Sequence, residues 1–208
     1  MDEYLSCKPF VTSFEIEKSV FEAAVAPVRD EAEAEAFVSE IRAKHPDATH
    51  NCYAYLCAVE KNIYRFSDDG EPGKTAGLPI LEAIRGRGLF NTGIVVSRGF
   101  GGIKLGAGGL VRAYSRAALA AIDGAGARKF ERAVALCVRC GYEHIPKFEN
   151  YLKGRERVCD KEFGERVSLR FWEREKDVEA VERELLDFSA GRAEIARGER
   201  SFRCFGED

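Results

Sequence analysis

The chain has 208 residues, of which 45% are hydrophobic and 32% are charged, and its formal net charge is −3. This balance is that of a globular protein with room for one large or two small domains, and it excludes a disordered or fibrous chain. The first ten residues lack the pattern of a secretory signal, and no apolar run reaches the length of a membrane span. The seven cysteines are odd in number and scattered, so we expect reduced thiols and a cytoplasmic protein.

The first half of the sequence predicts alternating strands and helices. Runs of β-branched and aromatic residues indicate a pair of strands over 10–17 and 19–26. Asp30 can cap a helix that ends near Lys44, because the apolar residues between them follow helical spacing. The other elements predicted in this half are strands over 52–59, 63–67 and 92–97 and helices over 79–86 and 109–123.

The predicted helix over 109–123 separates apolar residues from basic ones. Arg112 and Arg116 are one turn apart and lie together on one face. The predicted apolar face consists of Leu110, Val111, Tyr114, Ala117, Ala118, Ala121 and Ile122.

A domain boundary is predicted at residues 123–127, where the sequence reads DGAGA. It divides the chain into residues 1–126 and 127–208, and the strand and helix pattern restarts beyond it. The order β-α-β-β-α-β over about 80 residues is that of the ferredoxin-like fold. Asp177 is expected to cap the last helix, and Gly191 lies just beyond its end. The predicted elements are strand 130–141, helix 144–154, strands 156–162 and 166–173, helix 177–189 and strand 193–204.

Three motifs follow one another in the first half. They are His50-Asn-Cys-Tyr-Ala-Tyr55, then SDDGEPGKTAG from Ser67 to Gly77, then a segment from Ile94 to Tyr114 that contains GGIKLGAGG. Over most of residues 10–125 these motifs resemble the N-terminal domain of the IMPACT family, whose bacterial members are the YigZ-type proteins. The second half looks like the smaller C-terminal domain that accompanies it in bacteria.

The resemblance implies an α+β protein with two particular domain folds. The first would be like domain 2 of ribosomal protein S5 and the second ferredoxin-like, a pair similar to the last two domains of elongation factor G. Eukaryotic relatives are translation regulators that compete for a ribosome-associated activator of a stress kinase. The family usually reads Arg-aromatic-aromatic-Gly-Gly, whereas here Arg98 is followed by Gly99 and Phe100, so one ring that could stack on a base is missing.

A cationic surface is predicted around the glycine-rich loop over 99–109. Residues 83–118 contain six bases and no acid. Glycines allow backbone N–H groups to approach an anion, and a helix N-terminus favours negative charge. Alternatively, the glycines only permit tight turns and close packing. The candidate nucleic-acid or anion-binding residues are Arg98, Gly101, Gly102, Lys104, Gly106, Gly108, Gly109, Arg112 and Arg116.

The remaining motif residues have no assigned role. Carboxylates as close as those of the DDGEP loop could hold a divalent cation or share a proton, but helix capping, an Asx-turn or a partner contact is the simpler interpretation. A histidine can act as a general base, yet no nucleophile or metal ligand is identified beside this one, so a structural role is favoured. These residues are His50, Asn51, Asp68, Asp69, Glu71 and Lys74. We assign no catalytic residue and no metal site.

Cys137 and Cys140 have CxxC spacing but lie in a predicted strand. Positions three apart in a strand point to opposite faces, and a zinc site would need a second pair of ligands. We therefore predict that this pair is structural, with neither metal nor disulfide.

The sequence favours a non-catalytic, translation-associated regulatory protein. It would bind the ribosome, RNA or a translation-factor partner through the basic surface of the glycine-rich loop, without a cofactor and away from membranes. The alternative is a small-molecule phosphotransferase or hydrolase that uses the glycine-rich loop as a phosphate site, although the loop lacks the serines of such kinases. The sequence leaves the oligomeric state open.

Overall fold

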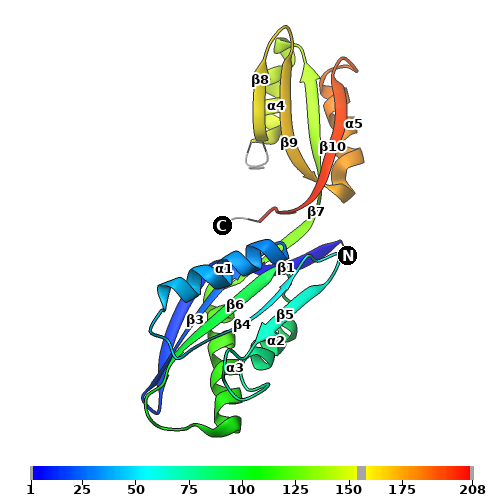
Figure 1. The fold of residues 1–208 in the computed structure, drawn as a ribbon. Coiled ribbons are helices and arrows are strands. Elements are labelled where there is room, and N and C mark those ends of the chain that lie inside the picture. Colours follow the sequence, from blue (N-terminus) through cyan, green and yellow to red (C-terminus); the bar gives the residue numbers. More distant parts are fainter. Residues whose placement is uncertain (1, 154–157, 207–208) are drawn as a thin grey trace. The chain divides into compact units, whose positions relative to one another are not determined.

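A computed structural model describes residues 2–153 and 158–206 as a mixed α+β protein (Figure 1). The chain divides into two compact units, one spanning Glu3–Lys129 and the other beginning at Phe130. Among the described residues, no helix is both long enough and apolar enough to cross a membrane.

The first unit contains a five-stranded antiparallel sheet in the order β2-β3-β6-β4-β5. β6 lies in the middle and is buried along nearly its whole length, as expected of an apolar strand with neighbours on both sides. The strands are β2 (Phe10–Ile16), β3 (Ser19–Pro27), β4 (His50–Cys57), β5 (Ile63–Ser67) and β6 (Thr92–Gly99).

Helices cover both faces of this sheet (Figure 1). Helix α1 (Glu31–Lys44) packs on one face, where Val38 and Ile41 contact buried residues of β3 and β6. Helices α2 (Gly77–Gly86) and α3 (Gly106–Ala125) pack on the other face over the larger core. The predicted cap of α1 is confirmed, since the side chain of Asp30 accepts a hydrogen bond from the backbone N–H of Glu33 at 2.9 Å.

The structure differs from the predicted elements at several boundaries of this unit. Strand β1 (Glu3–Cys7) was not predicted, and it lies beside the segment before β6, with the N–H of Phe90 donating to the carbonyl of Leu5 at 2.8 Å. Helix α3 starts earlier and ends later than predicted, so Gly126 alone joins it to strand β7 (Ala127–Cys140). Val111 is 37% exposed and does not belong to the apolar face of α3, where Ala113 is buried instead.

The second unit has the predicted order of elements, β-α-β-β-α-β. Its strands pair in the antiparallel order β10-β7-β9-β8, and both helices bury their apolar residues in one core. The elements after β7 are α4 (Ile145–Leu152), β8 (Val158–Phe163), β9 (Val167–Arg174), α5 (Val178–Phe188) and β10 (Glu194–Cys204).

Individual predictions in the second unit have mixed outcomes. Cys137 is exposed and Cys140 is buried, which confirms that they point to opposite faces of β7. Gly191 has the expected positive φ, 75°, beyond the end of α5. The predicted cap by Asp177 is wrong: its side chain makes no capping bond, because the residue closes a short 3₁₀ turn that leads directly into α5. The predicted start of β8 falls at 156–157, outside the described residues.

We expect the two units to fold independently, because each buries an apolar core of its own. Residues 1–129 and 130–208, expressed separately, should each give a single cooperative thermal transition by circular dichroism. A half that is unfolded while the whole chain is stable would contradict this expectation.

Candidate functional site

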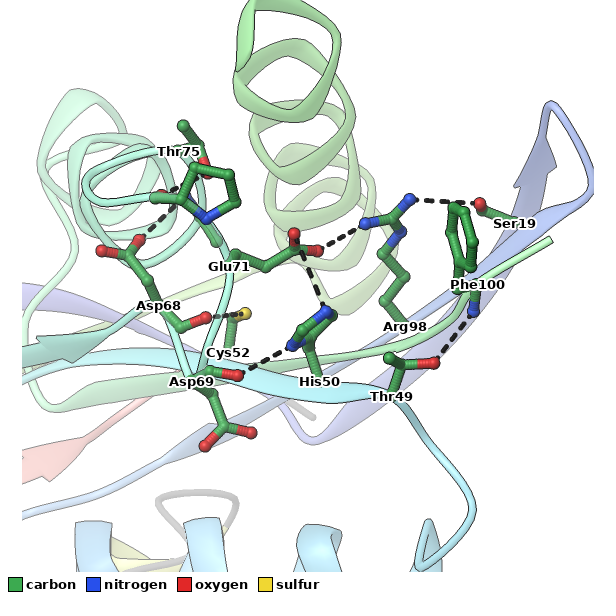
Figure 2. Close-up of polar contacts among 12 residues, drawn as sticks. Ser19, Thr49, His50, Cys52, Asp68, Asp69, Glu71, Thr75, Arg98 and Phe100 are labelled. Carbon is green, nitrogen blue, oxygen red and sulfur yellow. Dashed lines mark hydrogen bonds and ion pairs between the residues drawn. The ribbon is translucent and has the colours of Figure 1, made fainter. Parts of the chain in front are cut away.

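The three sequence motifs meet in one polar cluster between the sheet and helix α3 (Figure 2). His50 begins β4 and pairs across the sheet with Arg98 of β6. Glu71 comes from the loop between β5 and α2, and Tyr114 from α3. Residues more than 60 positions apart in the sequence therefore contact one another here.

An ion pair between Glu71 and Arg98 forms the centre of this cluster. Their side chains are only 4% and 5% exposed, and Arg98 Nη1 donates to Glu71 Oε1 at 2.7 Å. The hydroxyl of Tyr114 donates to the same oxygen at 2.8 Å, and burial raises the pKa of this phenol well above its usual value, with Cys52 and Glu71 adding to the effect. Two buried charges persist only because they are paired and hydrogen-bonded.

The position of Arg98 corrects the expectation that it belongs to an exposed basic surface. Its guanidinium carbon lies 5.4 Å from the ring centroid of Phe21 and 5.4 Å from that of Phe100, and its charge is directed inward to Glu71. Arg98 points inward because it pairs with Glu71, which lies in another motif and is brought near only by the fold.

The two aspartates of the loop hold the loop itself. Asp68 accepts from the backbone N–H groups of Lys74, Ala76 and Gly77 at 2.7, 3.0 and 2.8 Å, which satisfies donors at the N-terminus of α2. Asp69 accepts at 2.7 Å from the backbone N–H of Asn51 and at 2.8 Å from the guanidinium of Arg42 in α1. Asp68 therefore caps helix α2, which is one of the roles expected for the DDGEP loop. Among the residues that the structure describes, no group of three or more His, Cys, Asp or Glu could hold a metal ion.

His50, Asn51 and Cys52 also tie this loop to the sheet. His50 Nδ1 lies 2.8 Å from the carbonyl oxygen of Asp69, which can only accept, so Nδ1 carries a proton and Nε2 faces Glu71 Oε2 at 3.9 Å. The side chain of Asn51 accepts from a serine hydroxyl of β6 at 2.6 Å. Burial raises the pKa of Cys52 to about 12, so its thiol stays protonated and donates to the carbonyl of Asp68 at 2.9 Å.

Ser19 connects the cluster to the hairpin of β2 and β3 and to the glycine-rich loop. Its hydroxyl accepts from Arg98 Nη2 at 3.3 Å and from the backbone N–H of Gly101 at 3.2 Å. A Cβ at position 101 would lie 2.0 Å from the carbonyl carbon of Lys18, so the loop approaches the tip of the hairpin as closely as glycine alone permits.

The other loop glycines serve turns and packing in the structure. Gly102 and Gly106 have positive φ values of 86° and 70°, and Gly106 begins α3. Gly109 packs against Leu105, whose Cβ would be 3.0 Å from an added Cβ, and Gly108 lies beside the side chain of Arg112 in the first turns of α3.

The six bases of residues 83–118 fall into two groups. Three are neutralised by carboxylates: Arg85 by Glu82, Arg87 by Asp123, and Arg98 by Glu71. The other three are exposed, and none of the ion pairs in the described ranges involves them. They are Lys104, Arg112 and Arg116.

These three bases line one open hollow of about 520 Å³, which we name the basic hollow. Its wall combines the tip of the β2–β3 hairpin, the glycine-rich loop and one face of α3. Arg116 lies over the ring of Phe14, 4.6 Å from its centroid, which holds its guanidinium at the wall. The lining residues are Ile16, Glu17, Ile103, Lys104, Leu105, Gly109, Arg112, Ala113 and Arg116.

The sequence predicts the bases of the hollow but not its hairpin wall. Ile16 and Glu17 carry no motif, and the alternation of β2 indicates only that Phe14 and Ile16 share a face of the strand. Their proximity to α3 arises from the sheet order, which places β2 at an edge of the sheet, beside the helix.

Comparisons with known proteins match both units. The Impact N-terminal domain matches residues 17–122, and a domain of unknown function, DUF1949, matches residues 138–192. The chain is 35% identical to the IMPACT family member YvyE of Bacillus subtilis, over 90% of this chain and 87% of that one, and 33% identical to the IMPACT family member YigZ of Escherichia coli, over 90% and 93%. A solved structure described as a hypothetical protein has 32% identity and a TM-score of 0.65, and the match covers 96% of this chain and 98% of that one.

Proposed function

The chain belongs to the IMPACT family, and from that premise we propose that it is a binding protein of the translation apparatus that holds RNA phosphates in the basic hollow. The observation that carries this proposal is the division of the six bases. Half of them are paired with acids of the chain, and the unpaired half, Lys104, Arg112 and Arg116, lie around one concave surface. The resemblance to translation regulators supports a partner at the ribosome.

The chemistry of the hollow suits a polyanion. Each exposed base that contacts a phosphate releases bound counterions from the nucleic acid, so affinity is gained without sequence specificity and falls with salt. Glu17 is the one acid in the wall, which leaves the three bases in excess. A net charge of −3 over the whole chain does not oppose this local attraction, because charges beyond about 8 Å are largely screened at physiological salt.

The proposal also includes the specific fold of each unit and the location of the protein in the cell. A first unit like domain 2 of ribosomal protein S5 is supported by the family membership, and a ferredoxin-like second unit is supported by its element order and antiparallel sheet. Domains of residues 1–126 and 127–208 lie close to the division of the structure at Lys129. Free cysteines among the described residues support the reducing cytoplasm.

A hydrolase that used His50 with Asp68 or Asp69 is less well supported. Both aspartates accept backbone N–H bonds, and the Nδ1 proton of His50 is held by a carbonyl. The cluster therefore serves to hold the loop rather than to receive a substrate.

Co-sedimentation with ribosomes across a salt series tests the proposed function. Three phosphate contacts to single-stranded RNA predict that the logarithm of the association constant falls with the logarithm of salt concentration at a slope of about −2. Absence of association at low salt, or association that does not respond to salt, would contradict the proposal.

A further inference from the structure

We propose that the basic hollow receives one guanine nucleotide of single-stranded RNA and that Glu17 reads the base. This inference rests on the proposed function, because it specifies which part of an RNA enters the hollow. Single-stranded RNA is recognised when unstacked bases contact apolar or aromatic side chains and are hydrogen-bonded along their edges.

The hairpin tip carries Glu17 to the wall of the hollow. Glu17 and Lys18 are the two turn residues between the paired residues Ile16 and Ser19, and their φ values of 48° and 62° are those of a two-residue type I′ turn. The close approach of Gly101 to the backbone of Lys18 and its hydrogen bond to Ser19 hold this tip against the glycine-rich loop. The carboxylate of Glu17 is thus carried on a turn that these two contacts hold in place.

The three bases and one acid of the hollow require a ligand that carries both anionic groups and hydrogen-bond donors. Glu17 shares the wall with three bases, yet no ion pair in the part of the chain that the structure describes involves it. A simple polyphosphate would satisfy the bases and be repelled by this carboxylate. A nucleotide within RNA satisfies both, because its phosphates are anionic while its base can donate hydrogen bonds.

The carboxylate selects among the bases by its geometry as an acceptor. A carboxylate accepts two parallel hydrogen bonds when two donors lie side by side. Guanine presents such a pair, the ring N–H and the exocyclic amino group. Cytosine and adenine place an acceptor next to their amino group, and uracil flanks its ring N–H with two carbonyl oxygens. Guanine is therefore the base that fits.

The apolar part of the wall suits a base ring. Ile16, Ile103 and Leu105 line the same hollow as the charges, and Ile103 is 41% exposed. A volume of about 520 Å³ falls within the range of small-molecule sites, so one nucleotide can enter.

The test uses four uridine nonamers that carry guanine, inosine, adenine or uracil at the centre, with binding measured by fluorescence anisotropy. Inosine keeps the ring N–H and lacks the amino group. The wild-type chain should bind the guanine oligonucleotide about fivefold or more tightly than the other three, as expected for a good bidentate base contact. Glu17→Gln should reduce this preference to about one, because its amide turns a donor toward the donors of the base.

Glu15→Gln is the matched control. Glu15 is an exposed acid on the same hairpin, two residues away, and it does not line the hollow. Glu15→Gln removes the same charge as Glu17→Gln and should leave the preference for guanine unchanged. Both variants should keep the wild-type melting temperature.

Equal binding of the guanine and inosine oligonucleotides by the wild type would overturn this inference, as would a preference that survives in Glu17→Gln. In either case salt-dependent binding of all four would leave the proposed function standing. Failure to bind any of the four would overturn the inference and count against the proposed function too.

Discussion

Replacement of Arg98 by alanine should lower the free energy of unfolding by about 3–5 kcal/mol, because it leaves the carboxylate of Glu71 buried without its counter-charge. Among the described residues, the hydroxyl of Tyr114 would then be the remaining hydrogen-bond donor to that carboxylate. The variant also loses the packing of the guanidinium against the rings of Phe21 and Phe100. Chemical denaturation followed by circular dichroism measures the change.

Arg87→Ala is the control for this prediction. Arg87 also pairs with a carboxylate, that of Asp123, but both side chains are about half exposed, so its loss should cost about 1 kcal/mol or less. The double variant Arg98→Ala/Glu71→Ala should lose less stability than the sum of the two single variants, since it removes both buried charges together. A loss for Arg98→Ala no larger than that for Arg87→Ala would show that the pair does not organise the cluster.

Replacement of Gly101 by alanine should destabilise the first unit by about 1–3 kcal/mol, because the added methyl group would overlap the backbone of Lys18. Its Cβ would lie 2.0 Å from the carbonyl carbon and 2.1 Å from the carbonyl oxygen of that residue. Backbone cannot move aside as a flexible side chain can, so the hairpin tip and the loop must separate. The same thermal or chemical melt measures the effect.

Gly99→Ala distinguishes this close approach from a general sensitivity of the loop. Gly99 ends strand β6, and an added Cβ there would meet no atom within 4 Å. Because glycine weakens a strand relative to alanine, this variant should be neutral or slightly stabilising. Equal losses in the two variants would contradict the role assigned to Gly101.

Much of the fold could be predicted because the local patterns agree with the tertiary structure. The strands over 10–17 and 19–26 and the helix capped by Asp30 occur as predicted, since each has a clear apolar period and definite end signals. Strand β1 was missed because its sequence, EYLSC, has no β-branched residue and a single aromatic one, and because its pairing partners are supplied by distant segments. The predicted cap of α5 failed because a 3₁₀ turn took its place.

The candidate site was harder to predict because pairing between charges depends on the fold. The sequence shows six bases over 83–118 but does not show that Glu71 neutralises Arg98 or that Asp123 neutralises Arg87. For the same reason the glycine pattern suggested anion binding, whereas Gly101 is explained by a backbone that passes next to it. The hollow itself needs the hairpin tip, which no motif marks.

The central claim, that the basic hollow holds RNA phosphates, is tested most directly by the salt dependence of RNA binding in Lys104→Ala/Arg112→Ala. Both bases are exposed, so the melting temperature should not change, while the affinity at low salt should fall. The slope of the logarithm of the association constant against the logarithm of salt concentration should become less steep, changing from about −2 to about −0.7, because one of three phosphate contacts remains. Arg85→Ala/Arg87→Ala removes the same charge from bases that are already paired and should bind with the wild-type slope. An unchanged slope and affinity in Lys104→Ala/Arg112→Ala would contradict the claim.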